Sequence, residues 1–479
     1  MTNDTKRWLK IKKHLYSFYI AFVADLFEVT VPANHIYKLS LAIERLHKSS
    51  YDKNRLCVAM PPQHSKSSLI TIAYVTWLII HNPNLRILVV TAEKELAIGF
   101  GIKIRNLLYK LQPYIDFKVS EVKSSNTYLM FERNGELLGG EIRLTGFGGS
   151  ITGHAVDVMV IDDPYKGRED EFGPTALNKK WGEYTSLIEQ RLRPDSKLIL
   201  LHTRWHSEDI QGRIQANKYQ RTKYDFIKLP AIATEEKDIL GRKPGEPLWP
   251  EYYDLEFYQD KERIMGERKY QAIYQQQPLD LTSKFFYMDR LIFEDRFDDH
   301  VIARCRSWDI ASSDDTLGDE RDYTVGVRMV KTATGQYWIF DYERGQYGND
   351  VLNVIKRTAK LDSPAYRILL ETGTKGGAAG LLYDDYKKAL VGYSTKQSDP
   401  SSMSKADRAT PLRYAIFDGL VHVMITNDNL RQTFIDEFKA FPNGKHKDIV
   451  DAVAHGYNFL KEHDTDMVRT AGKRKRKRL

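Results

Sequence analysis

The stretch LCVAMPPQHSKS, residues 56–67, decides the fold of this chain. Its first five residues form a continuous apolar run, which predicts a buried β-strand. The polar turn that follows leads into a second apolar run, and we predict a helix from Ser67 to His81. A turn between a buried strand and a helix directs backbone N–H groups and the helix N-terminus at one point, where anions bind favourably. The stretch therefore predicts a phosphate-binding loop.

This loop matches the pattern GxxxxGK[ST] only in part, because Met60 and Ser65 stand at its two glycine positions. In that pattern Lys66 reaches the β- and γ-phosphates of a nucleotide, and the Ser67 hydroxyl binds Mg²⁺. A degenerate loop also arises by chance, so the hypothesis needs support from other parts of the chain. The candidate nucleotide-binding residues of the loop are Gln63, His64, Ser65, Lys66, Ser67 and Ser68.

Further buried strands lie outward from the loop. Residues 85–91, 158–161 and 198–201 are continuous apolar runs, separated by segments with helical periodicity such as 93–111. Continuous apolar strands that alternate with helices predict a parallel sheet with both faces covered. The sequence therefore predicts an α/β fold for this part of the chain, preceded by a helical segment over residues 1–50.

Polar side chains follow two of these strands. Asp162 and Asp163 end one strand: Asp162 is placed to bind Mg²⁺ through water, and Asp163 to orient or deprotonate the attacking water. Glu, one methylene longer, is the usual residue in the second role, and an Asp-capped turn is the alternative reading. Thr203 and Arg204 follow the next strand, at the sheet edge where ligands bind in open α/β folds, and could sense the γ-phosphate. A surface turn is the alternative there.

A different organisation begins after residue 218. Residues 219–285 contain several prolines and a charged run, which predicts a connecting subdomain. Residues 303–310, 324–330 and 337–342 are strand-like and joined by short connections, with Gly335 in the last turn, so an antiparallel meander is expected. Strand–helix units follow. The C-terminal half is therefore predicted to contain a mixed sheet.

Acidic residues stand at the ends of three of these elements. Asp309 ends the first strand of the meander, Glu371 ends a later apolar strand, and Asp448 opens the last helix. Asp451 and His455 share a helical face with Asp448. Converging carboxylates suit two hard cations about 4 Å apart, which activate water and stabilise the leaving oxygen of a phosphodiester. Ordinary helix capping is the alternative for Asp448, and a strand-end turn is the alternative for Asp309.

Basic residues near this acidic group, Lys375, Lys405 and Arg408, could hold a DNA backbone by charge, although single cations on a surface are commonly only solvated. Asp322 in a nearby acidic loop is a further residue of interest. The chain of 479 residues has a net charge of +8, of which the run KRKRKR at 473–478 supplies six, so about +2 remains on the rest. Such a run is expected to stay disordered until it meets a polyanion; a solubilising tail is the alternative.

Composition excludes several classes of protein. Hydrophobic residues make up 42% and charged residues 28%, which is typical of a globular chain. The two cysteines, Cys57 and Cys305, lie far apart, which argues against a disulfide framework or a cysteine–zinc site. The apolar run 69–80 is shorter than the roughly 20 residues of a membrane-spanning helix. We expect no membrane segment and no signal peptide.

The motifs in their order along the chain resemble the large terminase subunit of tailed bacteriophages. They are PPQHSKS (61–67), GSITG (149–153), VIDDP (160–164) and TRWH (203–206), and the segments LWPE (248–251) and YQQQP (274–278) also resemble that family. The resemblance covers about residues 30–460. It implies an N-terminal P-loop parallel-sheet ATPase domain and a C-terminal ribonuclease H-like mixed-sheet nuclease domain, in which Asp309, Glu371 and Asp448 match the metal ligands.

The resemblance also implies an organisation and partners. The expected domains are an ATPase domain (1–218, with a helical lid over 1–50), a linker subdomain (219–288), a nuclease domain (289–463) and a basic disordered tail (464–479). ATP and Mg²⁺ would be the cofactors, with Mn²⁺ an alternative at the nuclease site. Double-stranded DNA, the small terminase subunit and the procapsid portal would be the partners, in the host cytoplasm. A packaging ring would receive an arginine in trans, for which Arg143 is a guess.

Two other functions remain open from the sequence. One is a helicase- or repair-type ATPase whose C-terminal sheet only binds DNA. The other is a non-enzymatic, capsid-associated scaffold with a degenerate nucleotide-binding fold.

Overall fold

The computed structural model describes residues 3–31, 33–48, 53–149, 155–279, 284–311, 323–371, 377–397 and 404–475. Two compact units make up the chain: Met1–Glu171 with Leu177–Asp280, and Phe172–Ala176 with Leu281–Leu479. Each unit is described by itself. Within the described ranges, no helix combines the length and the apolar character needed to cross a bilayer.

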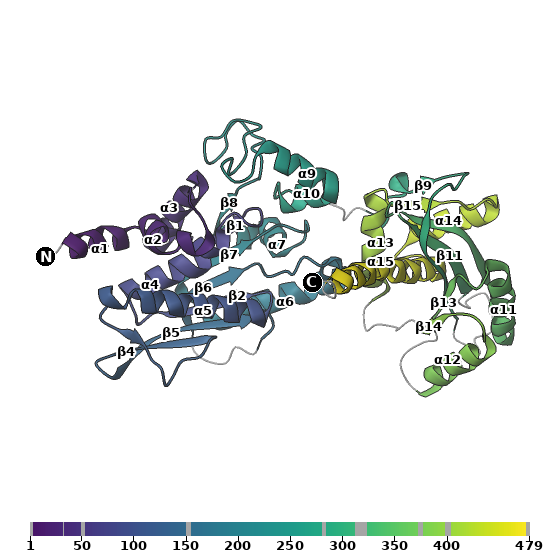
Figure 1. Cartoon of the computed structure of the whole chain (residues 1–479), viewed down its shortest axis with the longest axis horizontal. Helices are drawn as coiled ribbons and strands as arrows, with labels where there is room; N and C mark the ends of the chain where they lie inside the picture. The colour runs from purple at the N-terminus through teal and green to yellow at the C-terminus, as the bar shows by residue number, and fades with distance from the viewer. Residues whose placement is uncertain are drawn as a thin grey trace. The chain divides into compact units, whose positions relative to one another are not determined.

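The first unit is built on a sheet whose described strands have the order β3-β4-β5-β2-β6-β7-β1-β8 (Figure 1). The strands are β1 (Arg55–Ala59), β2 (Arg86–Thr91), β3 (Lys118–Val119), β4 (Tyr128–Arg133), β5 (Glu136–Gly146), β6 (Val156–Asp162), β7 (Leu192–His202) and β8 (Tyr224–Lys228). All neighbours from β5 to β8 in this order pair in parallel. The predicted parallel sheet is thus confirmed, and β3 and β4 add an antiparallel edge that the sequence analysis did not predict.

Helices of this unit precede, connect and follow the strands. They are α1 (Asn3–Lys13), α2 (Leu15–Phe22), η1 (Ala24–Phe27), α3 (Asn34–Lys48), η2 (Ser68–Tyr74), α4 (Val75–His81), α5 (Lys94–Lys110), η3 (Gln112–Tyr114), η4 (Glu169–Phe172), α6 (Pro174–Arg191), α7 (Ile210–Ala216), α8 (Lys218–Arg221), α9 (Leu255–Met265) and α10 (Glu267–Ile273). The helix predicted over 67–81 is present as η2, a π-helical stretch, and α4. All of η2 is buried, as expected for a helix that is apolar on every side.

The predicted linker region does not stand apart from the first unit. Strand β8 pairs with β1 over Arg55↔Tyr224 to Ala59↔Lys228, so the sheet continues beyond residue 218. Helices α9 and α10 bury a cluster of aromatic rings, among them Tyr258, Tyr270 and Tyr274. The first unit therefore extends to Asp280.

The second unit contains the predicted mixed sheet, with the order β14-β13-β10-β11-β12-β15-β9 in its described strands (Figure 1). Its strands are β9 (Ile292–Phe293), β10 (Val301–Asp309), β11 (Thr324–Thr332), β12 (Tyr337–Gly345), β13 (Arg367–Glu371), β14 (Thr395–Gln397) and β15 (Val421–Val423). The meander β10–β11–β12 is antiparallel, as predicted, and β13 pairs with β10 in parallel. The α/β fold class with two sheets is thereby confirmed.

The helices of the second unit are η5 (Met288–Arg290), η6 (Gly348–Asp350), α11 (Val351–Asp362), α12 (Gly377–Ala389), α13 (Lys405–Phe417), α14 (Asp428–Ala440) and α15 (Asp448–Lys475). Helix α15 packs across β10 and β11. A Cβ on Gly456 would stand 2.6 Å from the sulfur of Met329, so only glycine permits this close approach of α15 to the sheet. The backbone of α15 is helical as far as Lys475, and whether the basic tail is disordered until it meets a polyanion stays a prediction.

Candidate nucleotide and carboxylate sites

The phosphate-binding loop lies between β1 and η2, as the sequence predicts. Lys66 is 5% exposed, and its Nζ donates to Thr203 Oγ1 at 2.5 Å and lies 2.8 Å from Asp163 Oδ2. The backbone N–H of Thr203 donates to the other oxygen of Asp163 at 2.8 Å. The loop, the end of β6 and the end of β7 therefore meet at one point, at the carboxyl edge of the parallel strands.

Asp162 lies beside this group and is held by hydroxyls. Ser67 Oγ donates to Asp162 Oδ1 at 3.0 Å, and Thr71 Oγ1 donates to the second oxygen. Burial, together with the neighbouring charge of Asp163, raises the pKa of Asp162 to about 7. Sequence reasoning missed Thr71, although its position one helical turn after Ser67 was a usable signal.

The donor set fits a magnesium ion. Ser67 Oγ and a buried Asp162 carboxylate are hard oxygen ligands within 3.0 Å of each other. A carboxylate whose pKa is raised by burial lacks a cationic partner of its own, so a divalent ion would offset the cost of its charge. These two residues would hold the ion, and Lys66 would supply a second positive charge.

Three other predicted residues turn away from this point. His64 is 1% exposed, and its ring contacts Pro62 O and Tyr258 OH. Ser68 Oγ donates to Ser65 O at 2.9 Å. The side chain of Gln63 is exposed. These residues shape the loop through the backbone, and their side chains do not point to Lys66.

Arg204 is engaged elsewhere. Its Nε lies 3.0 and 2.8 Å from the two oxygens of Asp209, which is fully buried and caps α7 through Gly212 N. Breaking a buried ion pair leaves an uncompensated charge, so we expect this guanidinium to stay on Asp209. The backbone N–H of Arg204 donates to Gln276 Oε1 at 3.0 Å, which links the segments TRWH and YQQQP. The described contacts bring Thr203, but not the side chain of Arg204, to Lys66.

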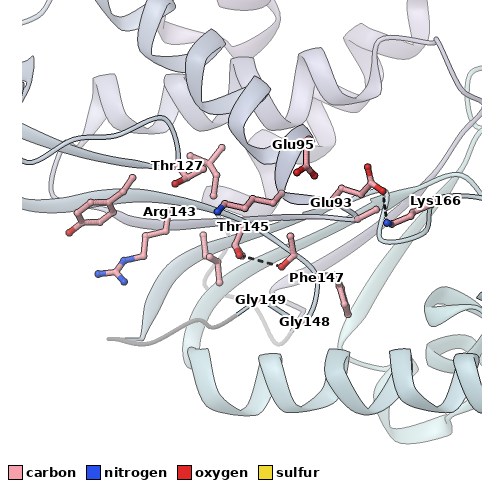
Figure 2. Close-up of a pocket in the computed structure, with 15 residues that line it drawn as sticks. Glu93, Glu95, Thr127, Arg143, Thr145, Phe147, Gly148, Gly149 and Lys166 are labelled. Atoms are coloured by element: carbon pink, nitrogen blue, oxygen red, sulfur yellow. Dashed lines mark hydrogen bonds and ion pairs between the residues drawn. The ribbon is translucent and has the colours of Figure 1, made fainter. Parts of the chain in front are cut away.

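A cavity of about 850 Å³ opens near the ends of β2 and β5 (Figure 2). Arg143 lines it and is paired with Glu141, with Nε 2.8 Å from Oε1. Figure 2 shows Arg143 pointing away from the ion pair between Glu93 and Lys166. Of the segment GSITG, only Gly149 lies in the described part of the chain, and the other four residues lie outside it.

The predicted carboxylates of the second unit share one electrostatic environment. Asp309 and Glu371 are register partners on the parallel strands β10 and β13. Asp448 and Asp451 open α15 and are 3% and 2% exposed. Burial, and then the charges of Glu371, Asp451 and Asp448, raise the pKa of Asp309 well above its usual value.

Cations from α13 occupy part of this carboxylate cluster. Lys405 Nζ lies 2.5 Å from Asp451 Oδ2. Arg408 Nη1 donates to Glu371 Oε1 at 2.8 Å, and its Nη2 lies 3.5 Å from Asp451 Oδ1. His455 Nδ1 lies 2.7 Å from Glu371 Oε2, and its Nε2 accepts from Arg408. Of the predicted basic residues, Lys405 and Arg408 are thus brought to the acids, and Lys375 lies outside the described residues, as does Asp322.

Carboxylate oxygens are the donors that Mg²⁺ and Mn²⁺ prefer, so the chemistry of this set fits a hard cation. Its arrangement is less complete: in the ranges that the structure describes, no three His, Cys, Asp or Glu side chains are arranged to hold one ion. Lys405 and Arg408 supply the neutralising charge instead. That Asp309, Glu371 and Asp448 share metal ions therefore stays a prediction.

Sequence reasoning missed one acidic residue here. Glu437 on α14 accepts from the backbone N–H groups of Ile449 at 2.6 Å and Val450 at 3.2 Å, and so caps α15. Burial raises the pKa of Glu437 to about 7, and the nearby Asp448 adds to the shift. No spacing in the sequence links Glu437 to the start of α15.

No family model matches this chain. Its sequence is 23% identical over 266 residues to a protein described as "Terminase, large subunit" from Enterobacteria phage T3, a match that covers 51% of this chain and 45% of that protein. The chain thus matches less than half the length of this curated relative.

Solved structures of large terminases also resemble this chain. That of a thermophilic bacteriophage gives a TM-score of 0.46 at 11% identity, covering 90% of this chain and 99% of that one. The HK97 bacteriophage large terminase gives 0.40 at 12% identity, covering 86% and 90%. TM-scores below 0.5 are too low to establish a common fold, so the assignment rests on the sequence match. That match confirms the resemblance stated from the motifs: over the aligned 266 residues, this chain is similar to a phage large terminase subunit.

Proposed function

We propose that this protein is an ATP-hydrolysing DNA-packaging motor subunit. The observation that supports this most directly is the convergence of Lys66, Ser67, Asp162, Asp163 and Thr203 at one edge of the first sheet. Enzymes that hydrolyse nucleotides use a lysine in a strand–helix loop to bind the phosphates, and a hydroxyl and a carboxylate to hold Mg²⁺. The sequence is similar to a protein described as a terminase large subunit, and the motif resemblance to that family implies the role of moving double-stranded DNA into a procapsid.

The residues have distinct tasks in this proposal. The ammonium group of Lys66 contacts Asp163 and Thr203 in the structure. When ATP binds, the γ-phosphate would replace Asp163 as its partner. Asp163 would then be free to orient the attacking water or accept its proton. Ser67 and Asp162 would hold Mg²⁺, which when bound neutralises the charge that develops on the phosphates.

A second activity is proposed for the carboxylate cluster: metal-dependent endonuclease cleavage of concatemeric DNA. Asp309, Glu371, Asp448 and Asp451 would hold Mg²⁺ or Mn²⁺, which when bound would activate water and stabilise the leaving oxygen. Lys405 and Arg408 form ion pairs with Asp451 and Glu371. We propose that both cations exchange these partners for a DNA phosphate when DNA binds. Contacts limited to phosphates predict weak sequence preference and strong salt dependence.

The partners belong to the same proposal. They are double-stranded DNA, the small terminase subunit and the portal, with the motor acting as a ring of copies of this chain in the host cytoplasm. In a ring, a neighbouring copy of the chain would supply an arginine to the nucleotide site. Arg143, one of the residues that line the cavity in Figure 2, remains the candidate for it.

Phosphate release from ATP tests the motor activity. Wild-type protein and Lys66→Ala are compared with Lys53→Ala, whose side chain is half exposed in a surface ion pair. We expect a loss of about 10³-fold in Lys66→Ala and no change in the control. Equal rates for wild type and Lys66→Ala would refute the proposal and leave the non-enzymatic scaffold.

A further inference from the structure

The phosphate-binding loop has an unusual backbone for its sequence. Gln63 and Ser65 have φ angles of 64° and 62°, in the left-handed region that favours glycine. Ser65 stands where the sequence pattern of such loops has its second glycine. Non-glycine residues persist in this region only when their surroundings hold them there. The loop therefore needs support that its own residues do not provide.

That support comes from the residues around His64. His64 Nδ1–H donates to Pro62 O at 2.7 Å, and His64 Nε2 accepts from Tyr258 OH at 2.7 Å. Burial lowers the pKa of His64 to about 3, so the ring is neutral and carries one N–H, as this pattern of one donor and one acceptor requires. Tyr258 lies on α9 and is fully buried.

Two more contacts hold the backbone carbonyl groups of His64 and Gln63. His35 Nε2, from α3, lies 3.1 Å from His64 O, and Tyr253 OH donates to Gln63 O at 3.3 Å. Both carbonyls lie between the strained positions 63 and 65. Each partner is remote in sequence, and Tyr258 is 194 residues from His64.

We propose that Tyr258 is a positioning residue for nucleotide binding: its hydroxyl fixes His64 and thereby holds the phosphate-binding loop in a shape that other loops obtain from glycine. This rests on the proposed function of the loop. The consequence is a trade between positions 258 and 65. Once glycine at position 65 removes the strain at that position, the loop should depend less on Tyr258, although Gln63 stays in the left-handed region.

A double-mutant cycle in the full chain tests this trade. The measurement is the dissociation constant of N-methylanthraniloyl-ADP, followed by fluorescence, for wild type, Tyr258→Phe, Ser65→Gly and the double variant. Loss of a hydroxyl donor to a buried acceptor predicts roughly tenfold weaker binding in Tyr258→Phe. In the Ser65→Gly background the same change should weaken binding less than about threefold.

Tyr270→Phe is the matched control. Tyr270 belongs to the same buried aromatic cluster and stacks on Tyr274, away from the loop, so its variant should bind like wild type. Equal binding by wild type and Tyr258→Phe overturns the inference, and so does an equal loss in both Ser65 and Ser65→Gly backgrounds, which would indicate general damage. Lys66→Ala separates the two claims: if it binds as wild type does, the nucleotide site itself is wrong; if only Lys66→Ala weakens binding, the inference alone fails.

Discussion

The carboxylates of the two acidic sites have different kinds of hydrogen-bond partner. In the first unit, Asp162 is held by the neutral hydroxyls of Ser67 and Thr71. In the second unit, Glu371 and Asp451 are held by the cations Arg408 and Lys405. A hydroxyl leaves the carboxylate charge uncompensated and open to a cation, whereas an ammonium or guanidinium group must first be displaced. In the function that we propose, the first site would therefore accept a metal ion directly, whereas in the second site Lys405 and Arg408 would first have to be displaced.

This difference follows from the position of the nearest cation. Lys66 forms its ion pair with Asp163 and not with Asp162. In the proposed function the lysine would bind the phosphates, and Asp162 would bind the metal ion. In the second site, Arg408 contacts both Glu371 and Asp451, and Asp448 accepts from the backbone N–H of Tyr323 at 3.2 Å. A DNA phosphate is an anion that both α13 cations can bind, so we expect DNA and metal binding to support each other there.

The largest expected effect is that of Asp162→Asn. ATP hydrolysis should fall by about 10³-fold, because the ligand charge for the cation is lost. At pH 8 the free energy of unfolding of the nucleotide-free protein should rise by about 2 kcal/mol, because a buried, uncompensated charge is removed. Phosphate release and thermal unfolding measure the two effects. Asp116→Asn, at an exposed site, serves as control; an Asp162→Asn variant that loses stability would contradict the uncompensated charge of Asp162.

The second site is tested by Glu371→Gln. Nicking of plasmid DNA in Mn²⁺ should fall by about 10²-fold, while ATP hydrolysis is retained. Asp384→Asn is the control, since this exposed residue on α12 lies outside the cluster. Unchanged nicking in Glu371→Gln would mean that the C-terminal sheet only binds DNA, as in the helicase- or repair-type alternative.

Arg408→Gln distinguishes the two modes of neutralisation. Without metal, its removal leaves buried acids unpaired and should lower the free energy of unfolding by about 3 kcal/mol. Added Mn²⁺ should recover much of this loss, because the cation replaces the guanidinium. Thermal unfolding with EDTA and with Mn²⁺ measures both, with the surface pair variant Arg357→Gln as control. A loss that Mn²⁺ does not reduce would show that Arg408 is only structural.

The smallest effect concerns pH. The pKa of Asp162 is raised to about 7, above its value of about 4 in the unfolded chain. Between these values the folded protein holds a proton that the unfolded chain has lost, so Asp162 makes stability fall as pH rises from about 4 to 7. Stability from pH 5 to 8 should therefore decline by about 1–2 kcal/mol more in wild type than in Asp162→Asn. Parallel curves would contradict the raised pKa.

The sequence predicted the elements whose burial is uniform. The segments 158–161 of β6 and 198–201 of β7 are buried and apolar without interruption, so their pattern is visible in a single chain. Strands β4 and β8 were missed, because they are only partly buried, contain charged residues and lie at or near the edges of the sheet. Their assignment depends on pairing with β5 and β1, which no local pattern encodes.

The acidic site residues were predicted from their positions at strand and helix ends, and the structure groups them. The partners of these residues could not be predicted in the same way. The pairing of Arg408 with Glu371 and that of Tyr258 with His64 depend on tertiary packing across 37 and 194 residues. Arg204 was assigned to the nucleotide because it follows a strand end, yet a buried Asp209 five residues later takes its charge.

We propose that one chain carries two separate centres, one for ATP hydrolysis and one for DNA cleavage. The most direct measurement is the rate of phosphate release and of plasmid nicking in the same preparations of wild type, Lys66→Ala and Glu371→Gln. We predict a crossed pattern, in which Lys66→Ala loses only phosphate release and Glu371→Gln loses only nicking. Loss of both activities in either variant, or of neither in both, would contradict two independent centres.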